Sequence, residues 1–155
     1  MQITLIAIGK NMPRWINDGF QTYAERMPTN YRLKLLEISS EKRHKSSDIN
    51  KILKSEGEKL LRAIPEGDIV VALDRVGKSL KTTDFAEHLK TWHDQSMNLS
   101  ILIGGPEGLS EACFQRADHC WSLSALTLPH PLVRIVVAEQ CYRAYSIITN
   151  HPYHR

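Results

Sequence analysis

A glycine-rich segment with the sequence GGPEG occupies residues 104–108, directly after an apolar stretch that ends at Ile103. Because glycine has no side chain, a turn of this composition allows the backbone to approach a ligand closely. The segment lacks the Gly-Lys-Ser/Thr ending of a phosphate-binding loop, and its glycine spacing differs from the dinucleotide-binding fingerprint. From the pattern alone it is either a ligand-contacting turn or a plain turn into a helix.

A second segment, LSALTLPH at residues 123–130, is small, mostly uncharged and closed by Pro129. In a parallel sheet a strand normally leads straight into a helix at this point. A segment of this kind is suited to wrap a flat apolar ring while its backbone N–H and C=O groups contact the polar edge, as an adenine site requires. The alternative interpretation is a strand with a proline-stiffened exit.

The C-terminal residues His151, Tyr153, His154 and Arg155 combine flat aromatic rings with positive charge. Such side chains can stack on an unpaired RNA base and contact its phosphate. Pro152 separates the two histidines and excludes a helical pair of metal ligands, so we expect no metal site. The alternative interpretation is a frayed terminus without a function.

Charge and composition limit the class of protein. The net charge of +3 permits a nucleic-acid partner without requiring one, and the basic run KRHK at residues 42–45 is either a solvated loop or an additional phosphate contact. Three cysteines without a C-x-x-C pair indicate neither a disulfide framework nor a zinc site, and they favour a reducing cytosol. No apolar run approaches the ~20 residues of a membrane span. We therefore expect a cytoplasmic protein.

The elements that must position these segments alternate along the chain, which with 155 residues suits a single domain over 1–155. Apolar runs predict strands over residues 2–8, 31–38, 68–74, 98–103 and 121–128. Helical periodicity predicts helices over residues 13–27, 49–64, 84–92 (capped by Asp84) and 110–118, and a last helix from Pro131, with a loop over residues 75–80. This alternation is typical of an open, mostly parallel α/β sheet with helices on both faces.

Ligands of such sheets bind beyond the carboxyl ends of the strands. The strand ends of interest are Gly9, Leu73 with Asp74, the glycine pair at 104–105, and the run at 123–128. Because parallel strands end at one edge, we expect these positions to form one pocket.

The last helix is predicted to bury an apolar stripe of Leu132, Ile135, Val136, Tyr142 and Tyr145. Glu139 falls inside this stripe, and Arg143, one turn later, is its expected ion-pair partner unless Glu139 faces water at the stripe's edge. The two tyrosines on the same surface indicate contact with a second subunit.

Taken together, three motifs resemble the RlmH-type methyltransferases of the SPOUT class, which are S-adenosylmethionine-dependent RNA methyltransferases. The motifs are IGGPEG at 103–108, WSLSALTLPH at 121–130 and NHPYHR at 150–155. The resemblance spans the whole chain, and the three motifs are specific in combination although each alone is not.

The resemblance implies a fold and an activity that the pattern did not provide. The fold is an α/β sheet with a deep trefoil knot at its C-terminal end, and the protein is a homodimer. The activity is methylation of N3 of a pseudouridine in the 23S (large-subunit) ribosomal RNA of the assembled ribosome, with S-adenosylmethionine as the methyl donor. No metal and no membrane are involved.

The resemblance also implies a set of site residues. The methyl donor is expected to contact Leu73, Gly104, Leu123, Ser124, Ala125, Leu126, Thr127 and Leu128. Catalytic candidates, with roles unassigned within the group, are His154, Tyr153, Arg155 and His130.

Two alternatives come from other classes of protein. One is a nucleotide-binding α/β enzyme that acts on a small metabolite, and it predicts tighter binding of ATP or NAD than of S-adenosylmethionine. The other is a non-catalytic dimeric RNA-binding module, which predicts ribosome affinity without any affinity for a methyl donor.

Overall fold

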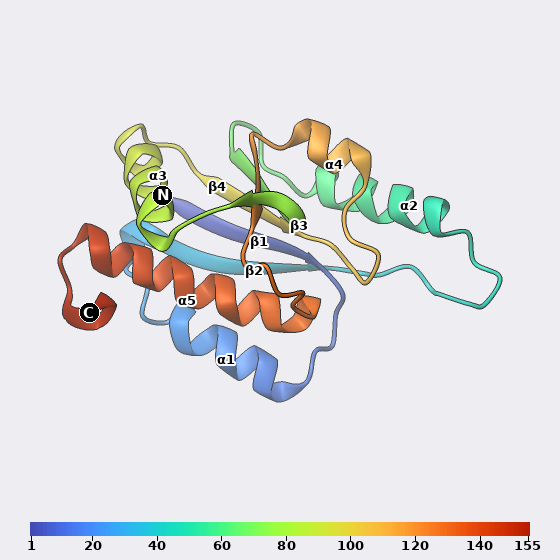
Figure 1. Cartoon of the computed structure of the whole chain (residues 1–155), viewed down its shortest axis with the longest axis horizontal. Helices are drawn as coiled ribbons and strands as arrows, with labels where there is room; N and C mark the ends of the chain where they lie inside the picture. Colours follow the sequence, from blue (N-terminus) through green and yellow to red (C-terminus); the bar gives the residue numbers. More distant parts are fainter.

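Five parallel strands form one sheet in the order β2-β1-β4-β3-β5. The computed structural model describes all residues from 1 to 155 (Figure 1). The strands are β1 (Gln2–Ile8), β2 (Arg32–Ile38), β3 (Ile69–Ser79), β4 (Leu99–Ile103) and β5 (His119–Ser122). β4 is buried along its whole length because helices cover both faces, as is usual for parallel sheets. The predicted parallel α/β architecture is confirmed.

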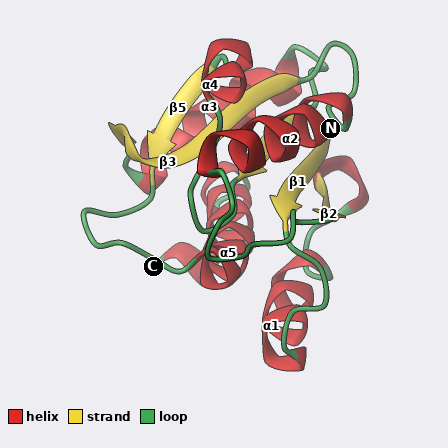
Figure 2. Cartoon of the chain, turned by 90° about the vertical axis from the view of Figure 1, so that its right-hand side faces the viewer, coloured by secondary structure: helices red, strands yellow, loops and turns green.

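The helices divide between the two faces of the sheet. They are α1 (Arg14–Ala24), α2 (Ile49–Arg62), α3 (Thr82–Asp94), α4 (Glu111–Arg116) and α5 (His130–Ile148). One apolar core joins Phe20 of α1, Leu89 of α3 and Val137 of α5 to the sheet, and a smaller core joins Leu60 of α2 to Cys113 of α4. Figure 2 shows α2 and α4 on the side of the sheet away from α1 and α5.

The ends of β3 and β5 differ from the prediction. β3 continues to Ser79 through residues that were expected to form a loop, and its pairing with β5 jumps from Leu73 to Lys78. Residues 74–77 therefore bulge out of the ladder. β5 ends at Ser122, so the predicted extended segment over residues 121–128 is wrong beyond this point. The chain leaves the sheet there because β3 itself ends at Ser79, the residue that pairs with Ser122.

Smaller differences concern the ends of helices. The first helix, predicted over residues 13–27, begins after Pro13, which is its N-cap residue, and ends at Ala24. Trp15 is 60% exposed because it lies beside the helix face that buries Ile16. Lys81 is the N-cap residue of α3, while Asp84, the predicted cap, lies inside the first turn. A short 3-10 turn, Thr29–Tyr31, precedes β2, so that strand begins one residue later than predicted.

The predicted buried stripe of α5 is wrong. The helix buries Arg134 and a row of mostly small side chains, Val137, Ala138, Cys141, Ala144 and Ser146, while the predicted large residues are only half-buried. α5 packs against both α1 and α3 as well as the sheet, and such close contact on several sides favours small residues. The large side chains are displaced to the flanks of the helix.

The route of the chain after β5 is consistent with the C-terminal knot that the resemblance implies. A loop over residues 123–129 leads from the sheet edge to α5, which returns across the sheet between α1 and α3 (Figure 1). No helix in the chain combines the length and the apolar character needed to cross a bilayer.

Candidate active site

A cavity of about 570 Å³ opens at the carboxyl edge of the sheet, where β3 and β4 end and the 123–129 loop begins. It brings together nearly all of the predicted donor contacts and one catalytic candidate. The predicted residues that line it are Leu73, Gly104, Leu123, Ser124, Leu126, Thr127, Leu128 and His130. Ala125 is exposed on the same loop and is not part of the lining.

The glycine-rich turn forms one wall of this cavity and leads on to α4. Its shape requires glycine, because a Cβ on Gly104 would lie 2.4 Å from the backbone of Gly108, which itself has a φ of +85°. The N–H of Gly108 donates to the carbonyl oxygen of Gly105 at 2.9 Å and closes the turn. The segment is a turn into a helix and its residues line the cavity, while the contact of this turn with a ligand stays a prediction.

The loop over residues 123–128 is held by its serines rather than by a strand ladder. The Ser122 hydroxyl donates to the carbonyl oxygen of Ser124, and the N–H of Leu126 donates to the Ser124 hydroxyl at 2.9 Å. The other N–H groups of this loop have no partner within the chain. The Leu126 side chain is 76% exposed. The loop thus offers backbone donors and leucine side chains to a ligand.

Of three charged residues at this edge, Asp74 was expected there as a strand end and Glu107 lies in the predicted glycine-rich turn, whereas Arg75 was not predicted. Asp74, Arg75 and Glu107 all line the cavity, so it is not free of cations as the donor's positive charge would favour. Asp74 shapes the bulge, since its carboxylate accepts from the N–H of Val76 at 3.0 Å. The signal that could have revealed Arg75 is its position directly after Asp74, at the predicted end of the third strand.

Glu107 belongs to a partly buried ion-pair network. The Arg43 guanidinium donates to Glu107 at 2.6 and 2.9 Å and pairs with Glu56 at 3.0 Å. Glu56 is only 2% exposed. The hydrogen bond with Arg43 lowers the pKa of Glu107 from its ordinary value. Arg43 is therefore directed inward, although the sequence placed it in a solvated basic run.

His130 is the histidine among the residues that line the cavity. Its Nδ1 is buried and has no hydrogen-bond partner. Burial lowers the pKa of His130, and the positive charges of Arg134 and Arg43 lower it further, so the imidazole is neutral near pH 7. A neutral imidazole in this position can accept a proton from a bound substrate.

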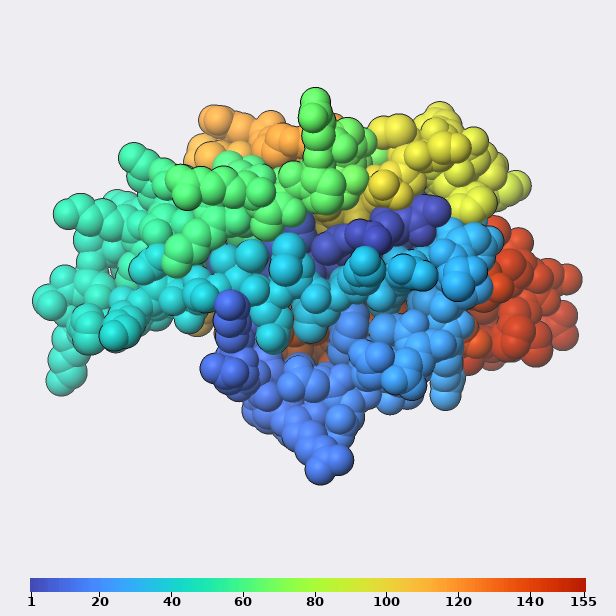
Figure 3. Space-filling view, turned by 180° about the vertical axis from the view of Figure 1, so that it is seen from behind, coloured from blue at the N-terminus to red at the C-terminus, as the bar shows by residue number.

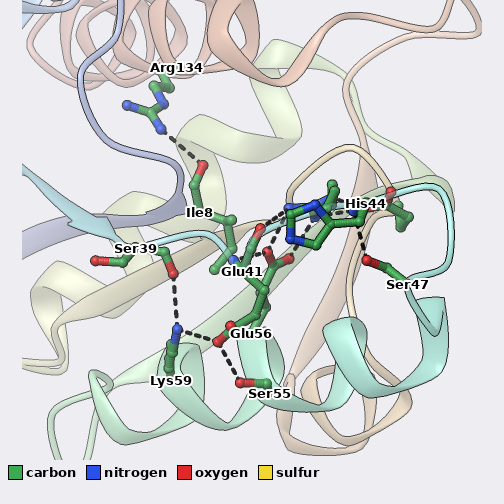
Figure 4. Close-up of polar contacts among 11 residues, drawn as sticks. Ile8, Ser39, Glu41, His44, Ser47, Ser55, Glu56, Lys59 and Arg134 are labelled. Atoms are coloured by element: carbon green, nitrogen blue, oxygen red, sulfur yellow. Dashed lines mark hydrogen bonds and ion pairs between the residues drawn. The ribbon is translucent and has the colours of Figure 1, made fainter.

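Arg134 lies behind His130 and connects α5 to the sheet. It is fully buried, donates to the carbonyl oxygens of Ile8 and Gly9 at 3.1 and 2.8 Å, and pairs with Glu37 at 2.6 Å. Figure 4 shows its contact with Ile8. This arginine fixes the first turn of α5, and with it His130, against the ends of β1 and β2.

The C-terminal residues lie far from this cavity within one chain. α5 has 19 residues and is about 28 Å long, with the cavity at its first turn and the tail at its last (Figure 1). The tail is docked rather than frayed, since the Tyr153 hydroxyl donates to Glu139 at 3.1 Å and the Arg143 guanidinium lies 5.0 Å from the Tyr153 ring centroid. The predicted pair of Glu139 with Arg143 is confirmed at 2.6 Å.

The tail contacts also limit the chemistry of its side chains. Burial raises the pKa of Tyr153 to about 12, with further contributions from hydrogen bonds to Tyr23 and Glu139. The phenol therefore stays protonated near neutral pH and acts as a hydrogen-bond donor. His154 has a buried Nδ1 without a partner.

A second, smaller recess of about 200 Å³ adjoins the cavity and shares Leu73, Ser122 and Leu123 with it. Its walls are mostly apolar and include Phe85 and Trp121. No group of three or more His, Cys, Asp or Glu side chains is arranged to hold a metal ion.

Comparison with known proteins gives matches over the full length. A family model described as "Predicted SPOUT methyltransferase" matches residues 1–154. The chain is 50% identical to "Ribosomal RNA large subunit methyltransferase H" of Coxiella burnetii (strain Dugway 5J108-111), and 47% identical to the protein of the same name in Marinomonas sp. (strain MWYL1). Both alignments cover 155 residues and the whole of each protein.

Solved structures agree on the fold. A probable methylase family protein from Haemophilus influenzae Rd KW20 aligns with a TM-score of 0.56 and 15% identity, over 99% of this chain and 70% of its own. A putative methylase family protein from Neisseria gonorrhoeae aligns with a TM-score of 0.55 and 12% identity, over 90% and 81%. With the family model matched along nearly its whole length, the chain belongs to the SPOUT methyltransferase family.

Proposed function

We propose that this methyltransferase transfers a methyl group from S-adenosylmethionine to N3 of a pseudouridine in 23S ribosomal RNA, on the assembled ribosome in the cytoplasm. The full-length similarity to two proteins named for methylation of large-subunit ribosomal RNA supports the substrate class. The observation that carries the proposal is the cavity itself, in which a leucine-rich loop with unused N–H groups faces a glycine-walled strand end.

The residues of this edge fit the proposed donor. Adenine is flat and apolar with a polar edge, which matches the leucines and the unpaired N–H groups of residues 123–128. The glycine turn leaves room for close backbone contact, and the apolar recess extends the binding surface. When bound, the donor supplies an electrophilic methyl group. The carboxylate of Asp74 in the lining favours a cationic ligand.

His130 is our candidate for the residue that takes the proton. Pseudouridine N3 carries a hydrogen and becomes nucleophilic only as that proton leaves, so a base beside it contributes to the rate. The neutral imidazole of His130 lines the cavity, and because its Nδ1 is buried, Nε2 is the ring nitrogen that would take the proton. Tyr153 cannot serve in this role because its pKa is raised to about 12.

We propose that each tail acts in the cavity of a partner subunit in a homodimer. Within one chain the length of α5 keeps Tyr153, His154 and Arg155 away from the cavity. A two-fold symmetric pair can bring the tail end of one α5 to the cavity end of the other. There Tyr153 and His154 supply flat surfaces for the base, and Arg155 supplies a cation for its phosphate.

The proposal is tested by mass spectrometry of ribosomal RNA from cells without the gene. We expect one pseudouridine of 23S RNA to lose one methyl group, and purified protein with S-adenosylmethionine to restore it on isolated ribosomes. A variant that lacks residues 153–155 should bind the donor normally and methylate poorly. Unchanged RNA in the deletion strain, or better binding of ATP than of S-adenosylmethionine in calorimetry, would refute the proposal.

A further inference from the structure

The segment between β2 and α2, residues 39–48, projects from the body of the molecule and is nevertheless well anchored. Figure 3 shows it standing out at one end of the molecule. Glu41 accepts hydrogen bonds from Ser55 and Lys59, and its N–H donates to Glu56 at 2.9 Å. Figure 4 shows these contacts together with the bond from the His44 N–H to Ser47. The projection therefore has a defined shape.

The basic side chains of the projection divide into two groups. Arg43 is directed inward, between Glu56 and Glu107, and is neutralised there. Lys42, His44 and Lys45 are exposed, and the ion pairs of the segment leave them without a carboxylate partner. Unpaired ammonium groups on an anchored support form a site for phosphate groups, which lysine contacts as a point charge.

The position of the projection relates it to the proposed substrate. β2 and β1 are parallel neighbours, so the projection leaves the sheet at the same edge as the cavity. Exposed Lys10 follows the end of β1 at this edge, and exposed Arg75 lies in the bulge of β3. Arg43 joins the base of the projection directly to Glu107, which lines the cavity. A basic rim thus runs outward from the reaction site.

We propose that Lys42, His44 and Lys45 bind backbone phosphates of the ribosomal RNA, and that Arg43 fixes this contact relative to the methyl-donor cavity. The inference rests on the proposed function. The contact is with the sugar-phosphate backbone and not with base edges, so it contributes affinity and orientation rather than sequence discrimination.

The test compares the double variant Lys42→Ala/Lys45→Ala with the control Lys34→Ala/Lys90→Ala, which removes two exposed lysines elsewhere on the surface. In the test variant we expect the KM for ribosomes to rise on the order of tenfold, with kcat and donor affinity unchanged. The slope of log KM against log salt should fall by about two, one for each lost phosphate contact. The control should behave as wild type.

Equal KM and equal salt slope in the test and control variants would overturn the inference while leaving ribosome methylation by the wild type intact. If the wild type itself fails to methylate ribosomes, it is the proposed function that falls. A photo-crosslinking amino acid at position 45 identifies the partner. A crosslink to ribosomal RNA supports the inference, and a crosslink only to a ribosomal protein contradicts it.

Discussion

Burial of His130 links the stability of the fold to the proposed catalytic role of this side chain. Burial keeps the imidazole neutral, which is the form a proton acceptor needs, but it also makes protonation of the folded protein unfavourable. The residue therefore lowers folded-state stability in acid while its imidazole stays in the neutral form.

The pH dependence of His130 follows from the direction of its pKa shift. As pH falls below 6.5, the ordinary pKa of histidine, His130 binds a proton in the unfolded chain before it does so in the folded chain. The free energy of unfolding of the wild type therefore decreases between pH 6.5 and the lower pKa of His130 in the folded state. His130→Gln should reduce this loss in denaturant titrations at several pH values. Part of the slope should remain, because burial also lowers the pKa of His119. An unchanged slope would contradict the assignment.

The same variant tests the catalytic role. We expect kcat on ribosomes to fall by a factor of about 100 in His130→Gln, as for loss of a general base, with donor affinity preserved. The pH profile of the wild type should fall on the acid side, and this limb should be absent in the variant. Wild-type kcat in the variant would remove His130 from the mechanism.

Gly104 gives a second prediction at the level of a residue. A Cβ at this position overlaps the backbone of Gly108, whereas a Cβ on Gly105 meets the ends of side chains at 3.2 Å. Gly104→Ala should displace the turn and lower kcat/KM about a hundredfold, because misplacement by an ångström costs that much. Gly105→Ala is the matched control and should lose much less. Wild-type kcat/KM in Gly104→Ala would show that the shape of the turn is unimportant.

Among the elements, α5 depends on one buried side chain for its position. Arg134 satisfies two strand-end carbonyl groups and Glu37, so Arg134→Met leaves all three without a donor. Breaking a buried ion pair costs about 3–5 kcal/mol, which should lower the Tm by roughly 10 °C. The exposed pair Arg116–Asp118 is the comparison, and Arg116→Met should change stability by less than about 1 kcal/mol. Thermal unfolding of both variants measures the difference.

An element was predictable from the sequence where local residues determine it, and was not predictable where contacts with segments remote in the sequence determine it. The strands follow from local apolar runs, and their parallel direction follows from the alternation of strands and helices, which also places the strand ends at one edge. The bulge at residues 74–77 was missed because it depends on where distant β5 ends. The face of α5 was wrong because contact on several sides overrides the size of an apolar side chain.

In the candidate site, the residues at strand ends were predictable from the sequence, whereas the positions of the tail and of Arg43 were not. Loop and glycine residues converge because each follows a strand end, which a sequence reveals. The separation of the tail from the cavity was not predictable, since it is set by the direction in which α5 crosses the sheet. The inward direction of Arg43 depends on Glu56 and Glu107, which are remote from it in sequence.

For the whole molecule, the position of the tail gives a prediction about mixed dimers. A variant without residues 153–155 and the cavity variant Gly104→Ala should each be nearly inactive. Exchanging their subunits in equal amounts should restore about a quarter of wild-type activity, because half of the dimers are mixed and each has one complete site. Ribosome methylation before and after subunit exchange measures this. No recovery would show that each tail serves its own chain.

The order of strands in the sheet has a consequence during synthesis. β4 is fourth along the chain but lies between β1 and β3, so the centre of the sheet is absent until residue 103 has left the exit tunnel. Until then the nascent chain carries β1 with one hydrogen-bonding edge open, which is the kind of edge that chaperones cover and aggregates extend. Translation that stops before this residue yields fragments prone to aggregation, whereas the sheet gains its central strand only once about two thirds of the chain has emerged.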